Sequence, residues 1–252
     1  ILNEINEELD DLVDEILEND NILGRMRELE EKDDYTFNHS LNVSMLSTML
    51  GKWIGYSQKQ IKQLALTGLF HDIGKLKIPD NIINKPGKLT DAEFAKMKQH
   101  SIYSYNILNE TIGISNNVAM GALQHHERED GSGYPLGLKG SEIHEYAKVI
   151  AVCDIYDAIT SNRVYRTKVS PFFAAEILSG EGFTFLEPKF TRVFLDKIAE
   201  FYVGCTVLLS NGDKGQIIYI HPQACTKAIV KVGDEFIDFL KPQEIEIVDI
   251  IK

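Results

Sequence analysis

Histidine and aspartate residues form the clearest candidate chemical site in this sequence. Two pairs are adjacent in the chain, His71-Asp72 and His125-His126, and each follows an apolar helical segment. Neighbouring residues on a helix diverge by about 100°, because one turn takes about 3.6 residues. Two adjacent ligands therefore suit two metal ions side by side better than one ion bound by both.

Three further residues extend this set. Asp154 directly follows the apolar run 149–153, where a carboxylate is costly to bury unless it is paired or binds a metal. His39 and His100 stand on other expected helices, and His100 alone would be interpreted as a structural histidine. Together, five histidines and two aspartates predict a mixed imidazole and carboxylate site, which favours iron, manganese or zinc over a thiolate-type site.

The elements that must position these residues are helices. Apolar stripes with helical spacing recur from residue 36 to about 203. Glycine and proline mark loops at 76–89 and 128–140. A capping box at Thr90–Glu93 and a proline after Ser170 predict two helix starts. The expected helices cover 36–51, 60–75, 90–108, 115–127, 141–160, 170–180 and 188–202.

After Gly204 the pattern changes to that of short strands. Asn211-Gly212 and Gly233-Asp234 each separate two strand-like segments, which predicts two hairpins. Residues 245–251 add a further candidate strand. The expected fold class is mainly α, with a small C-terminal β appendage.

The N-terminal segment differs from the rest in charge. Residues 1–34 contain 14 acidic and 3 basic residues, whereas the formal net charge of the whole chain is −12. Duplex nucleic acid is therefore not an expected partner. Apolar residues at heptad a and d spacing, with Asn19 in one d position, predict an amphipathic helix over 1–30. This helix either packs on its own domain or forms a coiled-coil stalk.

The composition is that of an ordinary globular protein, with 252 residues, 44% hydrophobic and 25% charged. No uncharged apolar stretch of about 18 residues occurs, and no secretory signal is expected. The chain begins with Ile1, which predicts a fragment or a processed product. We expect three units, an N-terminal helix at 1–34, a helical domain at 35–203 and the β appendage at 204–252.

The cysteines and the remaining histidines do not indicate a second site. Cys153, Cys205 and Cys225 show no CxxC spacing, which argues against a disulfide framework and favours a reducing, cytoplasmic compartment. His144 lies near a helix start and His221 precedes a proline, so both receive a structural interpretation.

The ordered motifs resemble those of the HD-GYP domain, a subgroup of the HD metal-dependent phosphohydrolases. The resemblance covers about 35–202 and rests on these segments: Tyr35–Ser40, His71–Lys75, Lys96–His100, Gln124–Glu127, Asp130–Pro135, Val152–Ala158 and Arg163–Arg166. It implies an HD-type helical bundle and a bacterial phosphodiesterase of cyclic di-GMP. The appendage is loosely similar to one that often follows this domain.

The resemblance also implies roles for individual residues. The implied metal ligands are His39, His71, Asp72, His100, His125, His126 and Asp154, with Asp72 bridging two ions. The implied substrate contacts are Lys75 at the scissile phosphate, the loop residues Gly133, Tyr134 and Pro135, and Arg163 and Arg166 at phosphate or guanine. Glu127 and Asp157 are expected to orient ligand histidines.

One position departs from the pattern of some family members. A glutamate four residues before the first histidine helps to bind a third metal in those proteins, and this chain has Tyr35 there. We therefore expect two divalent transition metals, iron or manganese. Two such ions can share a hydroxide and clamp a phosphodiester for in-line attack, giving linear pGpG. Whether a second cleavage to GMP follows stays open at this point. Proteins of the resembled family commonly carry upstream domains that signal through coiled-coil stalks, which favours a homodimer through residues 1–30.

Other functions remain open at this point. A different HD hydrolase could act on a (p)ppGpp-like or deoxynucleotide substrate, although Gly133–Pro135, Arg163 and Arg166 argue against it. A mixed GMP–AMP ring is another candidate substrate. A non-catalytic signalling or binding module is disfavoured by the intact ligand set.

Overall fold

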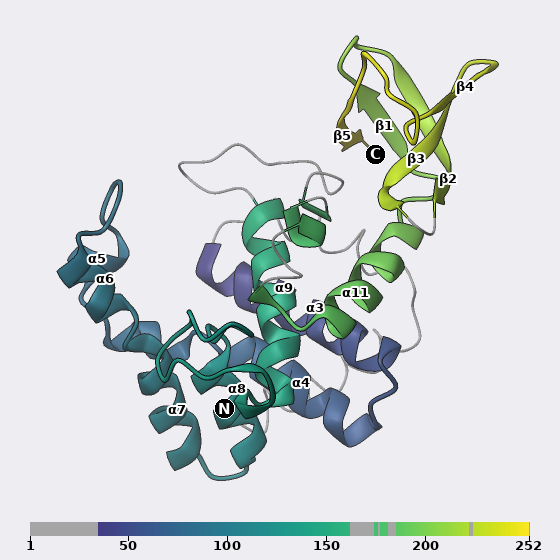
Figure 1. Cartoon of the computed structure of the whole chain (residues 1–252). Coiled ribbons are helices and arrows are strands. Elements are labelled where there is room, and N and C mark those ends of the chain that lie inside the picture. Colours follow the sequence, from purple (N-terminus) through teal and green to yellow (C-terminus); the bar gives the residue numbers. More distant parts are fainter. Residues whose placement is uncertain (1–34, 162–173, 176, 181–184, 222–223, 252) are drawn as a thin grey trace.

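A computed structural model describes residues 35–161, 174–175, 177–180, 185–221 and 224–251. The helices within these ranges form one bundle (Figure 1). The α-helices are α3 (Tyr35–Trp53), α4 (Gln58–Phe70), α5 (Asp80–Ile83), α6 (Asp91–Met97), α7 (His100–Glu110), α8 (Asn116–Gln124), α9 (Glu145–Thr160) and α11 (Pro188–Glu200). Two short 3₁₀ helices are η1 (Ile73–Lys77) and η2 (Gly140–Glu142).

Local capping fixes several helix starts. Thr90 and Glu93 form the predicted capping box of α6, with the Glu93 amide donating to Thr90 Oγ1. At the start of α8, the Ser115 side chain accepts the Val118 amide. Pro188 occupies the first turn of α11, where its missing N–H costs nothing.

The helix α9 forms the centre of the bundle. It packs against α3 and α8, and its residues Val149, Val152 and Cys153 are fully buried. A helix that is apolar on nearly all sides is stable only inside a core. This burial places Asp154, which follows Cys153, at a partly buried position at the edge of the core.

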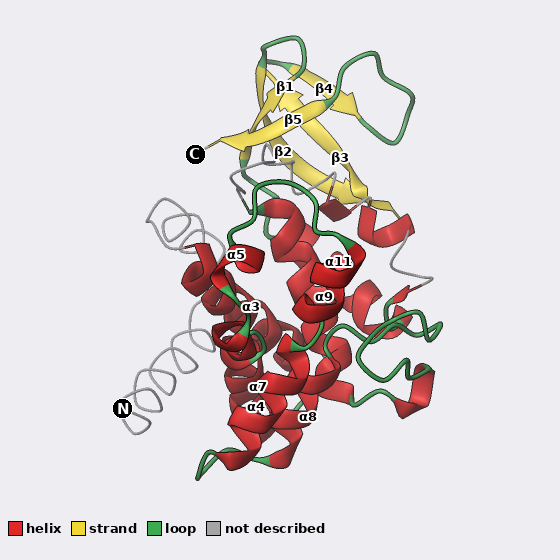
Figure 2. Cartoon of the chain, turned by 90° about the vertical axis from the view of Figure 1, so that its left-hand side faces the viewer, coloured by secondary structure: helices red, strands yellow, loops and turns green. Residues whose placement is uncertain are grey.

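The C-terminal residues form a five-stranded antiparallel sheet at one end of the bundle (Figure 2). Its strands are β1 (Thr206–Leu209), β2 (Lys214–His221), β3 (Ala224–Val232), β4 (Glu235–Asp238) and β5 (Ile247–Ile251), in the order β4-β3-β2-β1-β5. Both predicted hairpins are confirmed, and Gly212 and Gly233 adopt the positive φ of tight turns. Val207 and Ile217 join the same buried cluster as Phe194 of α11.

Several helix boundaries differ from the sequence-based expectation. The helix expected over 60–75 ends at Phe70, and η1 continues the chain. The loop expected at 76–89 contains the short helix α5, and the helix expected over 90–108 is broken between α6 and α7. At this break the Gln99 amide donates to the carbonyl of Lys96, three residues earlier. This is the bond of a 3₁₀ turn, and it interrupts the α-helical hydrogen-bond pattern.

The expected N-terminal helix at 1–30 and the start of the helix at 170–180 lie outside the described residues. Residues 177–180 are helical. Among the described helices, none has the length and apolar character needed to cross a membrane.

Candidate metal centre

The seven predicted ligands come from five helices and meet inside the bundle. His39 lies on α3 and Asp154 on α9, whereas His100 begins α7. The two adjacent pairs follow the last residues of α4 and α8. His71, His100 and His125 are at most 1% exposed, and His39 and Asp72 are 5% exposed.

The candidate ligands form two groups. One contains Asp72, His100, His125 and His126, and the other contains His39, His71 and Asp154. Within each group, the ligand atoms lie within 4.8 Å of one another. The helical geometry predicted that the two members of each adjacent pair would serve different ions. This holds for His71 and Asp72, which fall into different groups, but not for His125 and His126, which fall into the same group.

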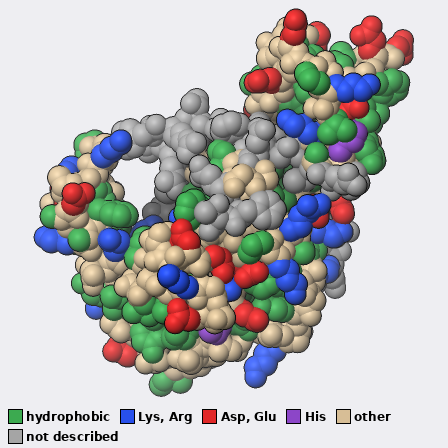
Figure 3. Space-filling view, in the orientation of Figure 1, with side chains coloured by type: hydrophobic (Ala, Val, Ile, Leu, Met, Phe, Trp, Pro, Cys, Tyr) green, Lys and Arg blue, Asp and Glu red, His purple; other side chains and the backbone are tan. Residues whose placement is uncertain are grey.

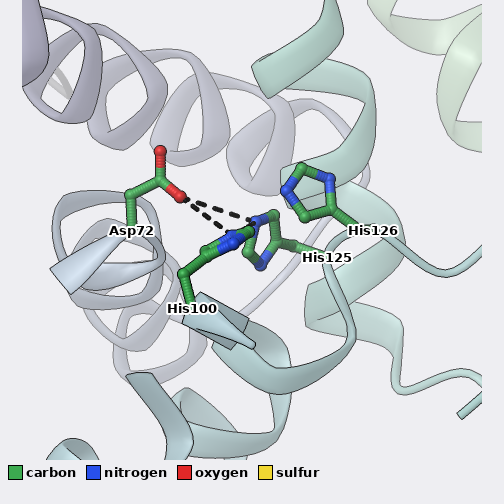
Figure 4. Close-up of side chains that lie close together, drawn as sticks. All are labelled: Asp72, His100, His125 and His126. Carbon is green, nitrogen blue, oxygen red and sulfur yellow. Dashed lines mark hydrogen bonds and ion pairs between the residues drawn. The ribbon is translucent and has the colours of Figure 1, made fainter. Parts of the chain in front are cut away.

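Asp72 lies between the two groups. Its Oδ2 is 3.4 Å from His71 Nε2 and 3.9 Å from His39 Nε2. Its Oδ1 faces the other way, 3.2 Å from His100 Nε2 and 3.9 Å from His125 Nε2 (Figure 4). One carboxylate oxygen therefore points to each group, which is the arrangement of a bridging ligand.

Backbone hydrogen bonds fix the orientation of three histidine rings. Each Nδ1–H donates to the carbonyl three residues earlier, at 2.7 Å, which leaves Nε2 with a free lone pair directed at the centre. The pairs are His71 with Gly68, His100 with Met97, and His125 with Ala122.

His39 is oriented by a carboxylate instead. Its Nδ1 donates to Asp157 Oδ2 at 2.6 Å, and its Nε2 lies 3.2 Å from Asp154 Oδ1. Asp157 Oδ1 accepts from Asn42 Nδ2 and Ser161 Oγ, at 2.8 and 2.9 Å. The expectation that Asp157 orients a ligand histidine is confirmed.

Burial and mutual repulsion keep two imidazoles neutral. Burial lowers the pKa of His126 to about 3, and it lowers the pKa of His125 well below the usual range, with neighbouring histidines adding to the effect. Burial alone would raise the pKa of Asp72, but electrostatic interactions with the adjacent His71 and with Lys75 hold it well below the usual range. Neutral imidazole and ionised carboxylate are the forms that bind metals.

The donor set fits divalent cations. His71 Nε2 and Asp72 Oδ1 are buried, and neither has a hydrogen-bond partner among the described residues. Unpartnered buried acceptors are costly unless another species satisfies them. Imidazole and carboxylate donors without cysteine suit iron, manganese or zinc.

The comparisons with known proteins agree with this geometry. The family model described as "HD domain" matches residues 18–185. This chain belongs to the HD domain family. HD domain phosphohydrolases bind divalent metals, and each of the two groups could hold such an ion. The sequence-based recognition of an HD-domain phosphohydrolase is confirmed by this match.

The relatives of this HD-domain protein include phosphodiesterases. A protein named cyclic di-GMP phosphodiesterase from Pseudomonas aeruginosa is 38% identical over 228 residues, 88% of this chain and 54% of that protein. Another of that name, from Thermotoga maritima, is 38% identical over 199 residues, 74% of this chain and 53% of that protein. The chain thus spans about half the length of these curated relatives.

One relative is named for a different cyclic dinucleotide. The 3′3′-cGAMP-specific phosphodiesterase 1 of Vibrio cholerae is 43% identical over 142 residues, 56% of this chain and 33% of that protein. Among solved structures, an HD-GYP-type protein from Bdellovibrio bacteriovorus matches with a TM-score of 0.65 and 22% identity, over 78% of this chain and 63% of that one. This likeness confirms the fold.

The loop that contains Gly133, Tyr134 and Pro135, called the GYP loop below, lies on the His126 side of the candidate centre. The Tyr134 ring lies 4.6 Å from the His126 ring. Gly133 fits because an added Cβ would come within 2.5 Å of backbone atoms of Glu127 and Arg128. Pro135 follows in the same loop, so the structure brings the predicted loop residues and the ligand group together.

The role predicted for Glu127 is wrong. Its two carboxylate oxygens accept the backbone amides of Leu136 and Leu138, at 2.7 and 2.9 Å. Glu127 is 3% exposed and therefore fixes the path of the GYP loop rather than a histidine ring. The sequence contains no local signal for this, because the partners are backbone groups nine and eleven residues away.

Some of the other predicted site residues lie within the described part of the chain, and others lie outside it. Lys75 lies in η1, not on a continuing helix, and its ammonium forms an ion pair with Asp72. Arg163 and Arg166 lie outside the described residues. Tyr35 begins α3, but its side chain is outside the described part, so the expectation of two metals stays a prediction.

The structural interpretation of the remaining two histidines is confirmed. His144 caps α9, where its Nδ1 accepts the Tyr146 amide at 3.1 Å. His221 pairs with Asp238 at 2.8 Å and joins two strands of the sheet.

Proposed function

We propose that this chain is a metal-dependent phosphodiesterase that hydrolyses cyclic di-GMP to linear pGpG and then to GMP. The observation that carries the proposal is the position of Asp72, with one carboxylate oxygen toward each ligand group. A bridging carboxylate between two groups suits a pair of ions that act together on one phosphodiester.

The two groups give each ion its own ligands. His39, His71 and Asp154 would bind one ion, and His100, His125 and His126 the other, with Asp72 shared. We propose iron or manganese, because the donors are imidazole and carboxylate. When bound, two such ions would provide positive charge for the phosphate and lower the pKa of water toward about 7.

The chain's own residues complete the site. The Lys75 side chain is 33% exposed, so its ammonium can reach a phosphoryl oxygen while remaining beside Asp72. Such a charge stabilises the negative charge that develops during phosphoryl displacement. We propose that Gly133, Tyr134 and Pro135 form a wall for the substrate and that Arg163 and Arg166 bind its phosphates or guanine.

A second candidate substrate is 3′3′-cGAMP. A relative named as specific for it is 43% identical over 142 residues of this chain. The same centre would serve both rings, because the scissile bond is a 3′–5′ phosphodiester in each.

The test combines metal analysis with a turnover assay on protein purified without oxygen. We expect two metals per chain and hydrolysis of cyclic di-GMP, with the products pGpG and GMP measured by chromatography. Parallel assays with 3′3′-cGAMP, ppGpp and dGTP separate the candidate substrates. Binding without turnover in fully loaded protein would support a non-catalytic module instead.

The control variants use histidines outside the centre. His221→Ala removes an imidazole from the sheet and should leave metal content and turnover unchanged. His71→Ala removes a ligand and should reduce both. Equal behaviour of the two variants would refute the site assignment.

We also propose that residues 1–30 pair two chains in the reducing cytoplasm. The heptad spacing supplies an apolar seam, and its acidic residues would repel across a dimer at low salt. The mass in solution should be that of a dimer for the full chain and that of a monomer after removal of residues 1–32. Added salt should strengthen the dimer of the full chain. A monomeric full chain at high micromolar concentration would refute the stalk.

A further inference from the structure

Lys98 lies in a corner formed by two aromatic rings. Its Nζ is 5.1 Å from the centroid of the Phe94 ring and 5.7 Å from that of the Tyr134 ring. The two rings are nearly perpendicular, with centroids 6.2 Å apart. Aromatic rings attract an ammonium group without neutralising it, so they fix its position and leave its charge available.

This corner adjoins the metal centre. Tyr134 contacts Lys98 on one side, while its ring lies 4.6 Å from His126 and 6.3 Å from His100. Lys98 follows α6, two residues before the ligand His100. One aromatic ring therefore separates the Lys98 ammonium from two candidate metal ligands.

Lys98 has no carboxylate partner among the described residues. By contrast, Lys75 pairs with Asp72 and Lys85 pairs with Glu93. Lys98 is partly buried. Basic side chains are visible over the arm that α5 and α6 form beside the bundle (Figures 1 and 3). An unpaired, positioned cation next to a phosphodiester-cleaving centre points to a second anionic group on the substrate.

We propose that Lys98 binds the phosphodiester that is not being cleaved, in a cyclic dinucleotide whose other phosphodiester lies at the metals. The inference rests on the proposed function and adds a residue to it. A cyclic dinucleotide carries two phosphate charges, and the metals with Lys75 would bind one of them. Arg163 and Arg166 would then bind guanine or share the second phosphate with Lys98. Phe94 and Tyr134 act through Lys98, as positioning residues for its ammonium.

The test compares Lys98→Met with Lys96→Met, which removes an exposed lysine from the neighbouring helix α6 and so matches the loss of charge. We expect Lys98→Met to raise the KM and the Kd of cyclic di-GMP roughly tenfold. It should also weaken the salt dependence of Kd, because one ion contact is lost. Lys98→Arg should restore most of the affinity, and Lys96→Met should change neither constant.

Three further compounds distinguish phosphate binding from other roles. Lys98→Met should weaken the binding of cyclic di-GMP, 3′3′-cGAMP and cyclic di-AMP by a similar factor. A loss of affinity confined to guanine-containing rings would overturn the phosphate assignment. The base-free bis(p-nitrophenyl) phosphate has one phosphodiester. The ratio of kcat/KM for cyclic di-GMP to that for this compound should fall roughly tenfold, and an unchanged ratio would also overturn the proposal.

Phe94→Leu provides a second variant that keeps an apolar side chain at a 46% exposed position. It removes one ring from the corner and should raise the Kd two- to fivefold, by roughly the strength of an exposed cation–π contact. Binding is measured apart from turnover. Protein that binds cyclic di-GMP without hydrolysing it would refute the proposed function, while the change in Kd would still decide the role of Lys98.

Discussion

Replacement of Asp157 would test directly whether the two ligand groups bind metals separately. Its Oδ2 accepts from His39 Nδ1 at 2.6 Å, and its Oδ1 accepts from Asn42 and Ser161. His39 is the one candidate ligand that Asp157 contacts within the described residues. A change at Asp157 should therefore act on the group of His39, His71 and Asp154 and not on the other.

The structure sets the expected size of the effect. Asp157 is 2% exposed, so Asp157→Ala leaves two buried donors, His39 Nδ1 and Asn42 Nδ2, without an acceptor. Loss of the partner behind a ligating histidine typically costs about 10–100-fold in metal affinity. That range corresponds to about 1.4–2.7 kcal/mol.

Asp157→Asn isolates the charge from the hydrogen bond. The amide oxygen can still accept from His39, and a flip of the Asn42 side chain would present its Oδ1 to the new amide N–H. Asn42 Oδ1 is buried and has no hydrogen-bond partner among the described residues, so the flip sacrifices no bond described for it. We expect Asp157→Asn to weaken the metal by less than Asp157→Ala.

The assay is competition with a chelator of known affinity, with metals counted per chain. Wild-type protein should bind two equivalents. Asp157→Ala should keep one equivalent at wild-type affinity, in the group that contains His100, His125 and His126, and bind the second more weakly. Thermal unfolding of each variant shows whether the fold survives.

Two results would refute this reasoning. Unchanged affinity for both equivalents in Asp157→Ala would show that Asp157 does not support a metal ligand. Equal weakening of both equivalents in the folded Asp157→Asn variant would show that the two groups do not bind separately.

Four other predictions follow from the same geometry. Asp72→Ala should remove both metals and abolish turnover while the far-ultraviolet circular dichroism stays helical; one retained metal would exclude a bridging role. Glu127→Ala should lower the free energy of unfolding by about 3 kcal/mol, since two hydrogen bonds to a buried carboxylate are lost, and it should raise KM, whereas Glu127→Gln should do less of both. Gly133→Ala should lower the Tm by several degrees, because its Cβ would lie 2.5 Å from backbone atoms; an unchanged Tm would show that the loop can move. Burial alone would lower the pKa of His39, but Asp154 and Asp157 raise it to about 10, so a proton must leave before a metal binds. Apparent affinity at that group should therefore rise between pH 7 and 10, and a flat profile in metal titrations would contradict this.

The candidate centre could be predicted from the sequence because its residues violate the pattern around them. Asp154 interrupts a helix that is otherwise buried, and His71-Asp72 ends an apolar helix. Burying such groups is costly, so their presence indicates a compensating role. The structure places these residues and their partners within two compact groups.

Features that depend on the path of the backbone could not be predicted. Glu127 binds amides of a loop whose course is set by Gly133, and no periodicity encodes that course. The break between α6 and α7 likewise lies within a continuous helical pattern. The position of Lys98 against Tyr134 depends on both, so the sequence alone gave no reason to single it out.

The break also explains how the ligand set is built. Carbonyls in the last turn of a helix have no intrahelical partner. Gly68 lies in the last turn of α4, Ala122 in that of α8, and Met97 is the last residue of α6. Each of these carbonyls accepts from the Nδ1 of a histidine three residues later, so one ring satisfies a helix end and presents Nε2 to the centre. A continuous helix over 91–108 would give the Met97 carbonyl an amide partner of its own and remove this support from His100, so the broken helix is part of the candidate metal centre.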